Sequence, residues 1–356
     1  MNKRYDQPLF IKIILVFIIL TITFEIGLRI FITSPSNHLY DPVIGFKYKP
    51  HSELFLGSEG FAKNTTNALG LNDEEFVLDE NKKRALILGD SYTEARQVAR
   101  YDNFSSITER TLPHWDLINA GRDGVHILHT YTIAKRLQTI IQPNLIVLVM
   151  NNGDYIGDMS DKHIKIIIKN NVISDMTLQA NPQEQLKQKF QWFVEKSALA
   201  VQLIRKFKPV FIEVHKNLTA MLNPPQAKTH TKYSSISSPT IEKTKLFSVF
   251  LKKLQTFAPV IIVYINQLEY ETTKHVYPAK KPYNNSLIVK KIAAENNIPF
   301  INTASYLTEQ YFLTKQPPFG FHNKHLPHGH LNENGHIGVS RALSTLIKQY
   351  DKALKK

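Results

Sequence analysis

A serine and a histidine, far apart in the chain, are the residues whose types and settings point most directly to chemistry. Ser91 follows an apolar run in "LILGDSYTEA", and His330 lies in "PHGHLNENGH". A serine that follows a strand and opens a helix sits where backbone N–H groups can stabilise an oxyanion. A histidine within reach of such a serine acts as its general base. The two residues therefore predict acyl transfer through a serine nucleophile.

Two further apolar runs end in small polar residues that suit an oxyanion site. "INAGRDG" contains Gly121, and "LIVLVMNNGD" ends in the polar residues 151–154. The carboxyl ends of parallel strands meet at one edge of a sheet, and ligands bind beyond that edge. We expect the N–H groups of Ser91 and Gly121, together with the side chain of Asn152, to donate to the oxyanion.

Each of these residues also has an ordinary structural explanation. Ser91 could cap the helix that follows it, because serine is a preferred N-cap residue. Gly121 could be a turn glycine, residues 151–154 a polar loop, and His330 a surface histidine. Their combination, in this order and at these strand ends, favours a catalytic site.

The elements that position these residues follow an α/β pattern. Short apolar runs without polar alternation are separated by segments with helical spacing, which is typical of a parallel sheet covered on both faces. The sequence therefore predicts a three-layer α/β/α fold of the flavodoxin-like type. The predicted strands lie within 84–90, 115–124, 143–154, 259–267 and 298–304, and the predicted helices between them within 101–112, 125–140, 286–297 and 335–350.

Two segments depart from this pattern and set the predicted domain boundaries. Residues 33–83 predict extended segments with glycine turns, placed before a hydrolase-like domain at 84–350. Residues 155–256 predict an insertion that caps one end of the sheet. Within it we expect a hairpin at 164–174, helices at 183–207 and 241–257, and a flexible loop at 223–240.

The N-terminal segment is apolar enough to cross a membrane. The 24 residues from Leu9 to Ile32 span about 36 Å as a helix, against a hydrocarbon core of about 30 Å. Lys12 can extend its amine outward near the start, and Glu25 and Arg29 are spaced to pair on one helix face. A buried core helix is a poorer explanation, because the segment has no polar face.

The flanking charges predict the orientation of this helix. Lys3 and Arg4 precede it, and no lysine or arginine follows Arg29 until Lys47. The positive-inside rule then places residues 1–8 in the cytoplasm and the remainder outside, in the periplasm. A cleaved signal peptide is the alternative, but the apolar segment is long for one and has no Ala-x-Ala site.

Composition excludes some classes of site. The chain has no cysteine, so disulfides, thiolate metal sites and a cysteine nucleophile are ruled out. Its 44 lysine and arginine residues exceed 30 aspartate and glutamate residues, for a net charge of +14. This balance suits acidic polymers or anionic membrane surfaces, although the basic residues are scattered. An outward-facing domain disfavours nucleic acid as a partner.

The sequence resembles the SGNH, or GDSL-type, hydrolases, in particular membrane-anchored members of bacterial envelopes. "LILGDSYTEA" is similar to block I, "INAGRDG" to block II, "LIVLVMNNGD" to block III and "HGHLNENGH" to block V. The resemblance implies Ser91 as nucleophile, Gly121 as oxyanion donor and His330 as base, with no cofactor and no metal. The segments "YDPVIGFKYKP" and "NALGLNDEEF" are similar to those that anchored members carry before the catalytic domain.

The chain departs from the family pattern at two positions. Block III of the family reads Gly-x-Asn-Asp, whereas here Gly153 occupies the place of the asparagine, and Asn151 or Asn152 would have to replace it. The family also places an aspartate two or three residues before the histidine, where this chain has His328 and no carboxylate. We therefore expect His330 to be oriented by another group, either a backbone carbonyl or a carboxylate from a distant segment.

Several histidines near the C-terminus raise the alternative of a metal site, because imidazoles suit zinc or nickel. Neither an H-E-x-x-H helix nor a cysteine pair accompanies them. A polar loop with one catalytic histidine is the favoured interpretation. The histidines concerned are His322, His325, His328, His330 and His336.

These observations predict an anchored periplasmic serine esterase acting on ester-linked acyl groups of envelope carbohydrate or lipid. An O-acyltransferase of envelope polysaccharide would use the same acyl-enzyme with a different acceptor, and a cap that excludes water would favour it. A catalytically weakened domain that binds an envelope glycan is the third hypothesis. Fold alone does not separate them.

Overall fold

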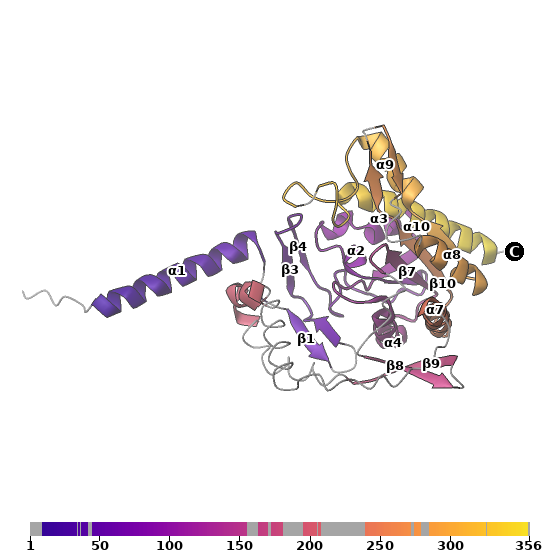
Figure 1. Ribbon diagram of the computed structural model, residues 1–356, viewed down its shortest axis with the longest axis horizontal. Helices are drawn as coiled ribbons and strands as arrows, with labels where there is room; N and C mark the ends of the chain where they lie inside the picture. The colour runs from indigo at the N-terminus through magenta and orange to yellow at the C-terminus, as the bar shows by residue number, and fades with distance from the viewer. Residues whose placement is uncertain are drawn as a thin grey trace, which may run out of the picture.

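The computed structural model describes most of the chain, including every predicted strand of the main sheet (Figure 1). The predicted loop at 223–240 lies outside the described residues up to residue 238, as do Lys3, Arg4, His325 and most of the helix predicted at 183–207. The described residues are 9–33, 35, 37–41, 45–154, 163–169, 172–180, 195–204, 206–207, 239–271, 274–278, 285–324 and 326–354.

A five-stranded parallel sheet forms the centre of the molecule. Its spatial order is β13-β10-β7-β5-β6, with every neighbouring pair parallel. Within the sheet, β5 comes first, β6 pairs on one side of it, and β7 then pairs on the other side. This reversal of strand order places a topological switch point between β5 and β7. The strands are β5 (Lys83–Leu88), β6 (Trp115–Asn119), β7 (Leu145–Asn151), β10 (Val260–Ile265) and β13 (Phe300–Asn302).

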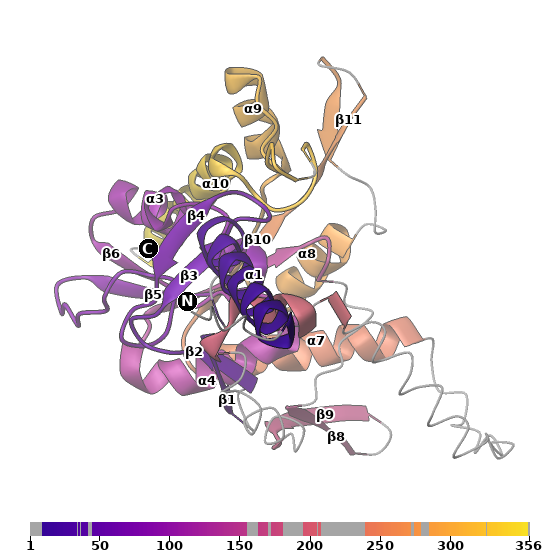
Figure 2. The same cartoon turned by 90° about the vertical axis from the view of Figure 1, so that its left-hand side faces the viewer.

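Helices cover both faces of this sheet (Figures 1 and 2). Alternate strand residues point to opposite faces, so Leu86 and Leu88 belong to one hydrophobic cluster and Ile87 to the other. The predicted three-layer α/β/α class is therefore confirmed. The first cluster lies under α4 (Thr130–Ile141), α7 (Pro239–Gln255) and α8 (Asn285–Glu295), and the second under α3 (Phe104–Thr111), α9 (Ala304–Thr314) and α10 (Glu333–Leu354).

The segment expected to cap the sheet, 155–256, contains two different kinds of structure. Strands β8 (Ile164–Lys169) and β9 (Val172–Leu178) form the expected antiparallel hairpin. Helix α7, by contrast, belongs to the layer on the sheet, because Phe247 and Phe250 are fully buried in the first cluster. The part of this segment that lies off the sheet therefore ends before α7.

The described residues before β5 contain one long helix and two small hairpins. Helix α1 (Leu9–Phe31) has a mean hydropathy of 2.6 and no buried residue in its most apolar window, so it is long and apolar enough to cross a membrane. The extended segments predicted at 33–83 are present as β1 (His38–Asp41) with β2 (Gly45–Tyr48), and β3 (Glu53–Leu56) with β4 (Ala62–Thr65). Strands β3 and β4 lie between α1 and the sheet (Figures 1 and 2).

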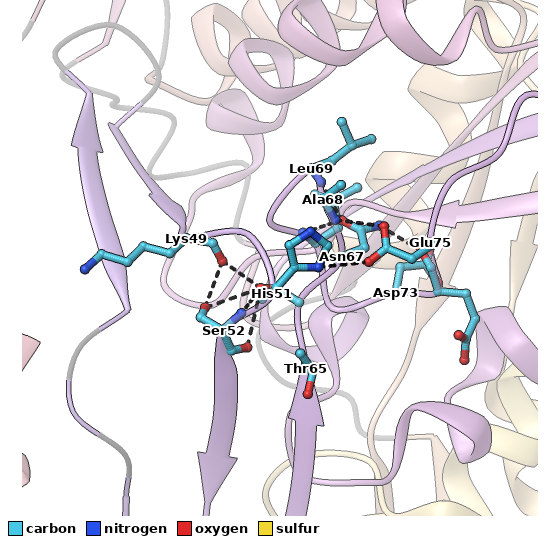
Figure 3. A network of polar contacts seen from close by, with 12 residues as sticks. Lys49, His51, Ser52, Thr65, Asn67, Ala68, Leu69, Asp73 and Glu75 are labelled. Atoms are coloured by element: carbon cyan, nitrogen blue, oxygen red, sulfur yellow. Dashed lines mark hydrogen bonds and ion pairs between the residues drawn. The ribbon is translucent and has the colours of Figure 1, made fainter.

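Polar contacts close the base of the second hairpin, and the segment after it is joined to the sheet (Figure 3). The carbonyl of Lys49 accepts from the hydroxyls of Ser52 at 2.8 Å and Thr66 at 2.7 Å. Further along, Asp73 accepts from the backbone N–H of Asn119 at 2.8 Å, at the end of β6. The hairpins are thereby connected to the same edge of the sheet that carries the predicted site.

Short elements complete the described chain. Strands β11 and β12 pair antiparallel at one side of α9. Helix α2 is a single turn directly after β5, and its first residue is the predicted nucleophile. These elements are α2 (Ser91–Glu94), η1 (Arg100–Asp102), η2 (Ile127–His129), β11 (Leu268–Tyr270) and β12 (Val276–Pro278).

Candidate active site

Ser91 is the first residue of helix α2, directly after the end of β5. The residue that caps this helix is Asp90, whose side chain accepts from the backbone N–H of Tyr92 at 3.0 Å. The alternative in which Ser91 serves as the N-cap is therefore wrong. Its hydroxyl points elsewhere, to a histidine ring.

His330 lies in the loop before α10 and contacts the serine directly. Its Nε2 is 2.8 Å from Ser91 Oγ, across 239 residues of sequence. The hydroxyl of Tyr92 donates to the carbonyl of Gly329 at 2.9 Å and accepts from Gln267 Nε2 at 3.1 Å. The predicted pair is thus brought together, and the loop that carries the histidine is held by the residue that follows the serine.

A glutamate from the N-terminal segment stands behind the histidine. Glu59 Oε2 lies 2.9 Å from His330 Nδ1, and Glu59 Oε1 accepts from the backbone N–H of His330 at 2.9 Å. The Glu59 side chain is only 6% exposed. A carboxylate in this place holds the imidazole in one orientation and stabilises its protonated form.

Burial and hydrogen bonding act in opposite directions on this carboxyl group. Burial alone would raise the pKa of Glu59. The hydrogen bonds from the ring and backbone of His330, with the charges of His330 and Lys324, outweigh burial and lower the pKa to about 2. Lys324 Nζ lies 3.6 Å from the same oxygen. Glu59 is therefore ionised at neutral pH.

The chain leaves room for Glu59 by placing a glycine beside it. Gly329 has a φ of +112°, and a Cβ added there would lie 2.6 Å from Glu59 Oε1. Asn323 holds the loop that carries Glu59, because its side-chain amide donates to the carbonyls of Gly57 at 3.0 Å and Gly60 at 2.7 Å. Its side-chain oxygen also accepts from the Gly60 N–H at 3.0 Å. Both sides of the loop are thus set by the C-terminal region.

Glu59 is the residue that sequence reasoning did not identify. The group that orients His330 was left open between a backbone carbonyl and a distant carboxylate, and the structure has the carboxylate. The only local signal is one glutamate in the short stretch "LGSEGFA", inside a segment without periodicity. Position in the fold, rather than any motif, identifies it.

Gly121 packs against the turn that carries the serine. A Cβ added at Gly121 would lie 2.4 Å from the Glu94 nitrogen and 2.6 Å from the Thr93 carbonyl carbon, so only glycine fits. Its N–H donates to the side-chain oxygen of Asn119 at 2.9 Å. Asn119 in turn donates to the carbonyl of Thr93 at 2.8 Å. The glycine is therefore required for close approach to α2.

The loop after β7 is organised around Asn151. Its amide donates to Asp90 Oδ2 at 2.8 Å, and its side-chain oxygen accepts from the N–H of Gly153 at 2.6 Å. Asn151 thereby holds the residue that precedes the nucleophile. Asn152, the neighbouring side chain on this loop, is largely buried.

Two partly buried carboxyl groups lie at this end of the sheet, one of them in the residue before the nucleophile. Burial raises the pKa of Asp90 and raises that of Asp154 well above its usual range, and the charge of Asp90 adds to the effect on Asp154. Asp154 Oδ2 accepts from the backbone N–H of Asn151 at 2.9 Å. Protonation of one carboxyl group relieves the repulsion between them.

A buried ion cluster connects the end of α2 to the loop after β6. Glu94 Oε2 lies 3.2 Å from Arg96 Nε and accepts from the backbone N–H of Asp123 at 2.9 Å. Arg96 also contacts the carboxylate of Asp123. Burial raises the pKa of Glu94, and the charge of Arg96 opposes this change. The cluster joins the turn that carries Ser91 to the segment that carries Gly121.

The other histidines near the C-terminus that the structure describes differ in their surroundings. His336 is fully buried, and burial lowers its pKa to about 3. It accepts from the backbone N–H of Phe104 at 3.3 Å. His322 and His328 are exposed, and His325 lies outside the described residues. Within the described part of the chain, no three His, Cys, Asp or Glu residues are grouped to hold a metal ion.

Comparison with known proteins gives similarity to solved structures alone. No protein-family model and no curated protein matches the chain. A member of the lipolytic G-D-S-L family from Veillonella parvula has 13% identity and a TM-score of 0.39, over 75% of this chain and 98% of that one. The psychrotrophic esterase EstA from Pseudoalteromonas sp. has 10% identity and a TM-score of 0.39, over 76% and 100%. An acetyl xylan esterase, AlAXEase, has 14% identity and a TM-score of 0.38, over 74% and 98%. At these values the similarity assigns neither activity nor substrate, and the fold class rests on the sheet of this chain.

Proposed function

We propose that the chain is a serine esterase of the SGNH type that acts on ester-linked acyl groups of cell-envelope carbohydrate or lipid. The observation that carries this proposal is the continuous line of contacts from Ser91 Oγ through His330 to Glu59, at 2.8 and 2.9 Å. A hydroxyl, an imidazole and a buried carboxylate in this order form the machinery of serine acyl transfer. The carboxylate weakens the case for an inactive glycan-binding domain.

In the first step, His330 Nε2 takes the proton from Ser91 Oγ as the oxygen attacks the ester carbonyl. The carbonyl oxygen becomes an oxyanion, and we assign its donors to the N–H groups of Ser91 and Gly121 and the side chain of Asn152. In the free site, the Gly121 N–H donates to Asn119, so this donor must be shared with the oxyanion. Glu59 stabilises the imidazolium that forms.

In the second step, His330 returns its proton to the leaving alcohol, and Ser91 carries the acyl group. Water then attacks the acyl carbonyl while His330 takes its proton, and His330 returns that proton to Ser91 Oγ as the bond between Ser91 and the acyl group breaks and the acid leaves. The proposed reaction consumes water and uses only the groups named. If a sugar hydroxyl replaced water, the same steps would give acyl transfer.

We further propose that α1 is retained as a single membrane anchor, with the enzyme on the extracytoplasmic side. A removed signal peptide has no reason to contact the folded domain. Here the carboxylate of Glu25 accepts from the backbone N–H groups of Ala198 and Leu199, both at 2.8 Å. The carbonyl of Ile32 accepts from the N–H of Gly57 at 3.0 Å. These contacts support an anchor that forms part of the folded protein.

Covalent labelling tests the proposed site directly. The full chain in detergent would be treated with a fluorophosphonate, beside Ser91→Ala and His330→Ala, with hydrolysis of a short aryl ester measured in parallel. Labelling and turnover should both require Ser91 and His330. Folded wild-type protein that is neither labelled nor faster than Ser91→Ala would overturn the proposal.

A further inference from the structure

The end of helix α1 is joined to the loop that carries Glu59. Thr33 forms an antiparallel bridge with Leu56, and the N–H of Gly57 donates to the carbonyl of Ile32. A Cβ added at Gly57 would lie 2.1 Å from the carbonyl oxygen of Phe31, so the two backbones are in direct contact. Glu59 follows two residues later. The exit of the apolar helix and the acid of the site are thus parts of one local structure.

A second contact ties the last turns of α1 to the segment 195–207. Besides the two backbone N–H groups, the hydroxyl of Ser197 donates to Glu25 Oε2 at 2.9 Å. Arg29 donates to the carbonyl of Lys196 at 2.7 Å. Glu195 of this segment pairs with Lys49, next to the first hairpin, at 2.8 Å. The contacts at Glu25 and Ile32 therefore hold α1 in a fixed direction relative to the domain.

The order of apolar and charged residues along α1 indicates where the surface of the bilayer lies on this helix. The apolar run that follows Lys12 ends at Phe24, and Glu25 and Arg29 place charged groups in the last turns of the helix, where charged side chains meet water and lipid head groups. Residues 196–199, which contact Glu25 and Arg29, therefore lie at the head-group level. Extended chain covers at most about 3.6 Å per residue, so Glu59 lies within about 7 Å of Gly57 along the backbone.

Apolar side chains are exposed in both segments that contact the end of α1. Leu203, Ile204 and Phe207, in the segment bound to Glu25, are 45, 48 and 46% exposed. Phe61, two residues after Glu59, is 66% exposed and contacts the ring of Phe55. Large apolar groups beside a spanning helix are stabilised by insertion among lipid head groups. These four residues form the surface that we expect to contact the bilayer.

We propose that the site is held against the membrane surface and takes its ester from an amphiphile embedded in the same bilayer. This inference rests on the proposed function and narrows the substrate to esters on molecules that the bilayer itself retains. A fixed direction matters here, because a site that faces the bilayer meets embedded esters in a productive orientation. Two kinds of molecule carry an ester that the bilayer retains through a hydrocarbon chain: an acylated sugar on a lipid carrier, and an ester of a membrane lipid.

Two fluorophosphonates with the same reactive group test the proposal without knowledge of the substrate. One carries a long alkyl chain that partitions into lipid, and the other a short ethylene glycol chain that remains in water. The full chain in phospholipid nanodiscs would be compared with an uncoupled variant, which has Glu25→Ala and a flexible ten-residue Gly-Ser insert between Phe31 and Ile32. The same insert between the exposed residues Glu80 and Asn81 is the matched control.

We expect the uncoupled variant to lose at least about fivefold in the rate of labelling by the alkyl probe, because orientation is lost while the tether remains. Labelling by the water-soluble probe should stay within about twofold, which also reports that the variant is folded. The control insert should change neither rate. An unchanged ratio of the two rates in the uncoupled variant would overturn the inference. Failure of both probes with wild type would overturn the proposed function instead.

A measurement of depth keeps the inference testable if the uncoupled variant does not fold. The chain has no cysteine, so single fluorophores can be attached at Phe61→Cys, Leu203→Cys and, as a control, Leu354→Cys. Leu354 is the last residue of α10, whose C-terminal end lies far from α1 (Figure 1). Nitroxide-labelled lipids in the nanodisc should quench the first two fluorophores and not the third. Equal quenching at all three positions would contradict the proposed orientation.

The two sources of such an ester are separated by the product released. Nanodiscs would contain either an octadecyl glucoside acetylated on its sugar or a phospholipid with short acyl chains. Acetate release that requires Ser91 identifies an acylated sugar held by a lipid chain as the substrate class. Fatty acid release that requires Ser91 identifies a membrane lipid.

Discussion

The parallel sheet and the N-terminal hairpins contribute to the same site in different ways. The strands of the sheet are buried on both faces. Ser91 lies at the carboxyl end of β5 and contacts His330. The hairpins are pairs of four-residue strands that contribute one carboxylate, Glu59. The difference shows that the sheet and the loop before α10 can supply the candidate nucleophile and base while the carboxylate comes from a separate N-terminal hairpin.

Removing the nucleophile tests the contribution of the sheet and should have the largest effect. Ser91→Ala should lower ester turnover by about 10⁴-fold or more, because no other group forms the acyl-enzyme. The melting temperature should change little, since the lost hydroxyl is not part of the core. Turnover of a short aryl ester and thermal unfolding measure the two. A variant with substantial residual turnover would show that another residue attacks.

Removing the charge of the acid tests the contribution of the hairpins. Glu59→Gln should lower turnover by about 10²–10⁴-fold, because an amide does not stabilise the imidazolium and can favour the wrong tautomer of His330. Glu53→Gln, in the same hairpin but paired with Lys63 at the surface, is the matched control and should be near wild type. If both variants were equally active, Glu59 would be a structural residue only.

Glu59→Gln should also change how the free energy of unfolding depends on pH. The pKa of Glu59 is lowered from 4.5 to about 2 in the folded protein. Its stabilising contribution is therefore present above pH 4.5 and is lost as the pH falls from there towards 2. The difference in free energy of unfolding between wild type and Glu59→Gln should shrink across that range. Denaturant unfolding from neutral pH to about pH 3 measures it, and a constant difference would contradict the ionised state of Glu59.

These two residues also show what the sequence can and cannot predict in such a site. Ser91 and His330 lie in motifs whose local pattern, a strand end before a helix and a polar loop before another, is visible in the sequence. Glu59 meets His330 across 271 residues, and its own surroundings have neither periodicity nor a distinctive spacing. A contact that exists only in three dimensions leaves no such local pattern. The N-cap role of Asp90 was missed for another reason, because aspartate and serine are equally good caps.

A smaller effect is expected where the C-terminal loop approaches the acid. Gly329→Ala places a methyl group 2.6 Å from Glu59 Oε1 at a φ of +112°, which only glycine adopts readily. We expect a loss of about 1–3 kcal/mol in stability and about a tenfold fall in turnover as Glu59 is displaced. Gly124→Ala, also at a positive φ but with open space around it, controls for backbone strain. Equal turnover in the two variants would show that the contact with Glu59 is unimportant.

The smallest effect should come from the tyrosine that supports the loop. Tyr92→Phe removes the hydrogen bond to the carbonyl of Gly329 but keeps the ring, which lies 5.1 Å from that of His330. A net hydrogen bond contributes about 1 kcal/mol, so turnover should fall by about fivefold or less. Steady-state kinetics measures it. A loss as large as that of Glu59→Gln would place Tyr92 in the chemistry itself.

The fold was more predictable than the site, with one instructive exception. The five strands of the sheet were each visible as buried apolar runs, and the hairpin at β8 and β9 followed from its pattern. Helix α7 was expected in an insertion because the residues before it interrupt the α/β rhythm. Its place on the sheet depends on Phe247 and Phe250 finding the same hydrophobic cluster as α4, and a sequence pattern does not state which core a helix will join.

The contact between Glu59 and His330 also has a consequence for how the protein is made. Glu59 emerges from the ribosome early and His330 late, and the loop between Asn323 and Gly329 must close on the early segment before the acid is in place. A nascent chain therefore contains a serine that lacks both base and acid. The line of contacts from Ser91 through His330 to Glu59 can therefore form only near the end of synthesis.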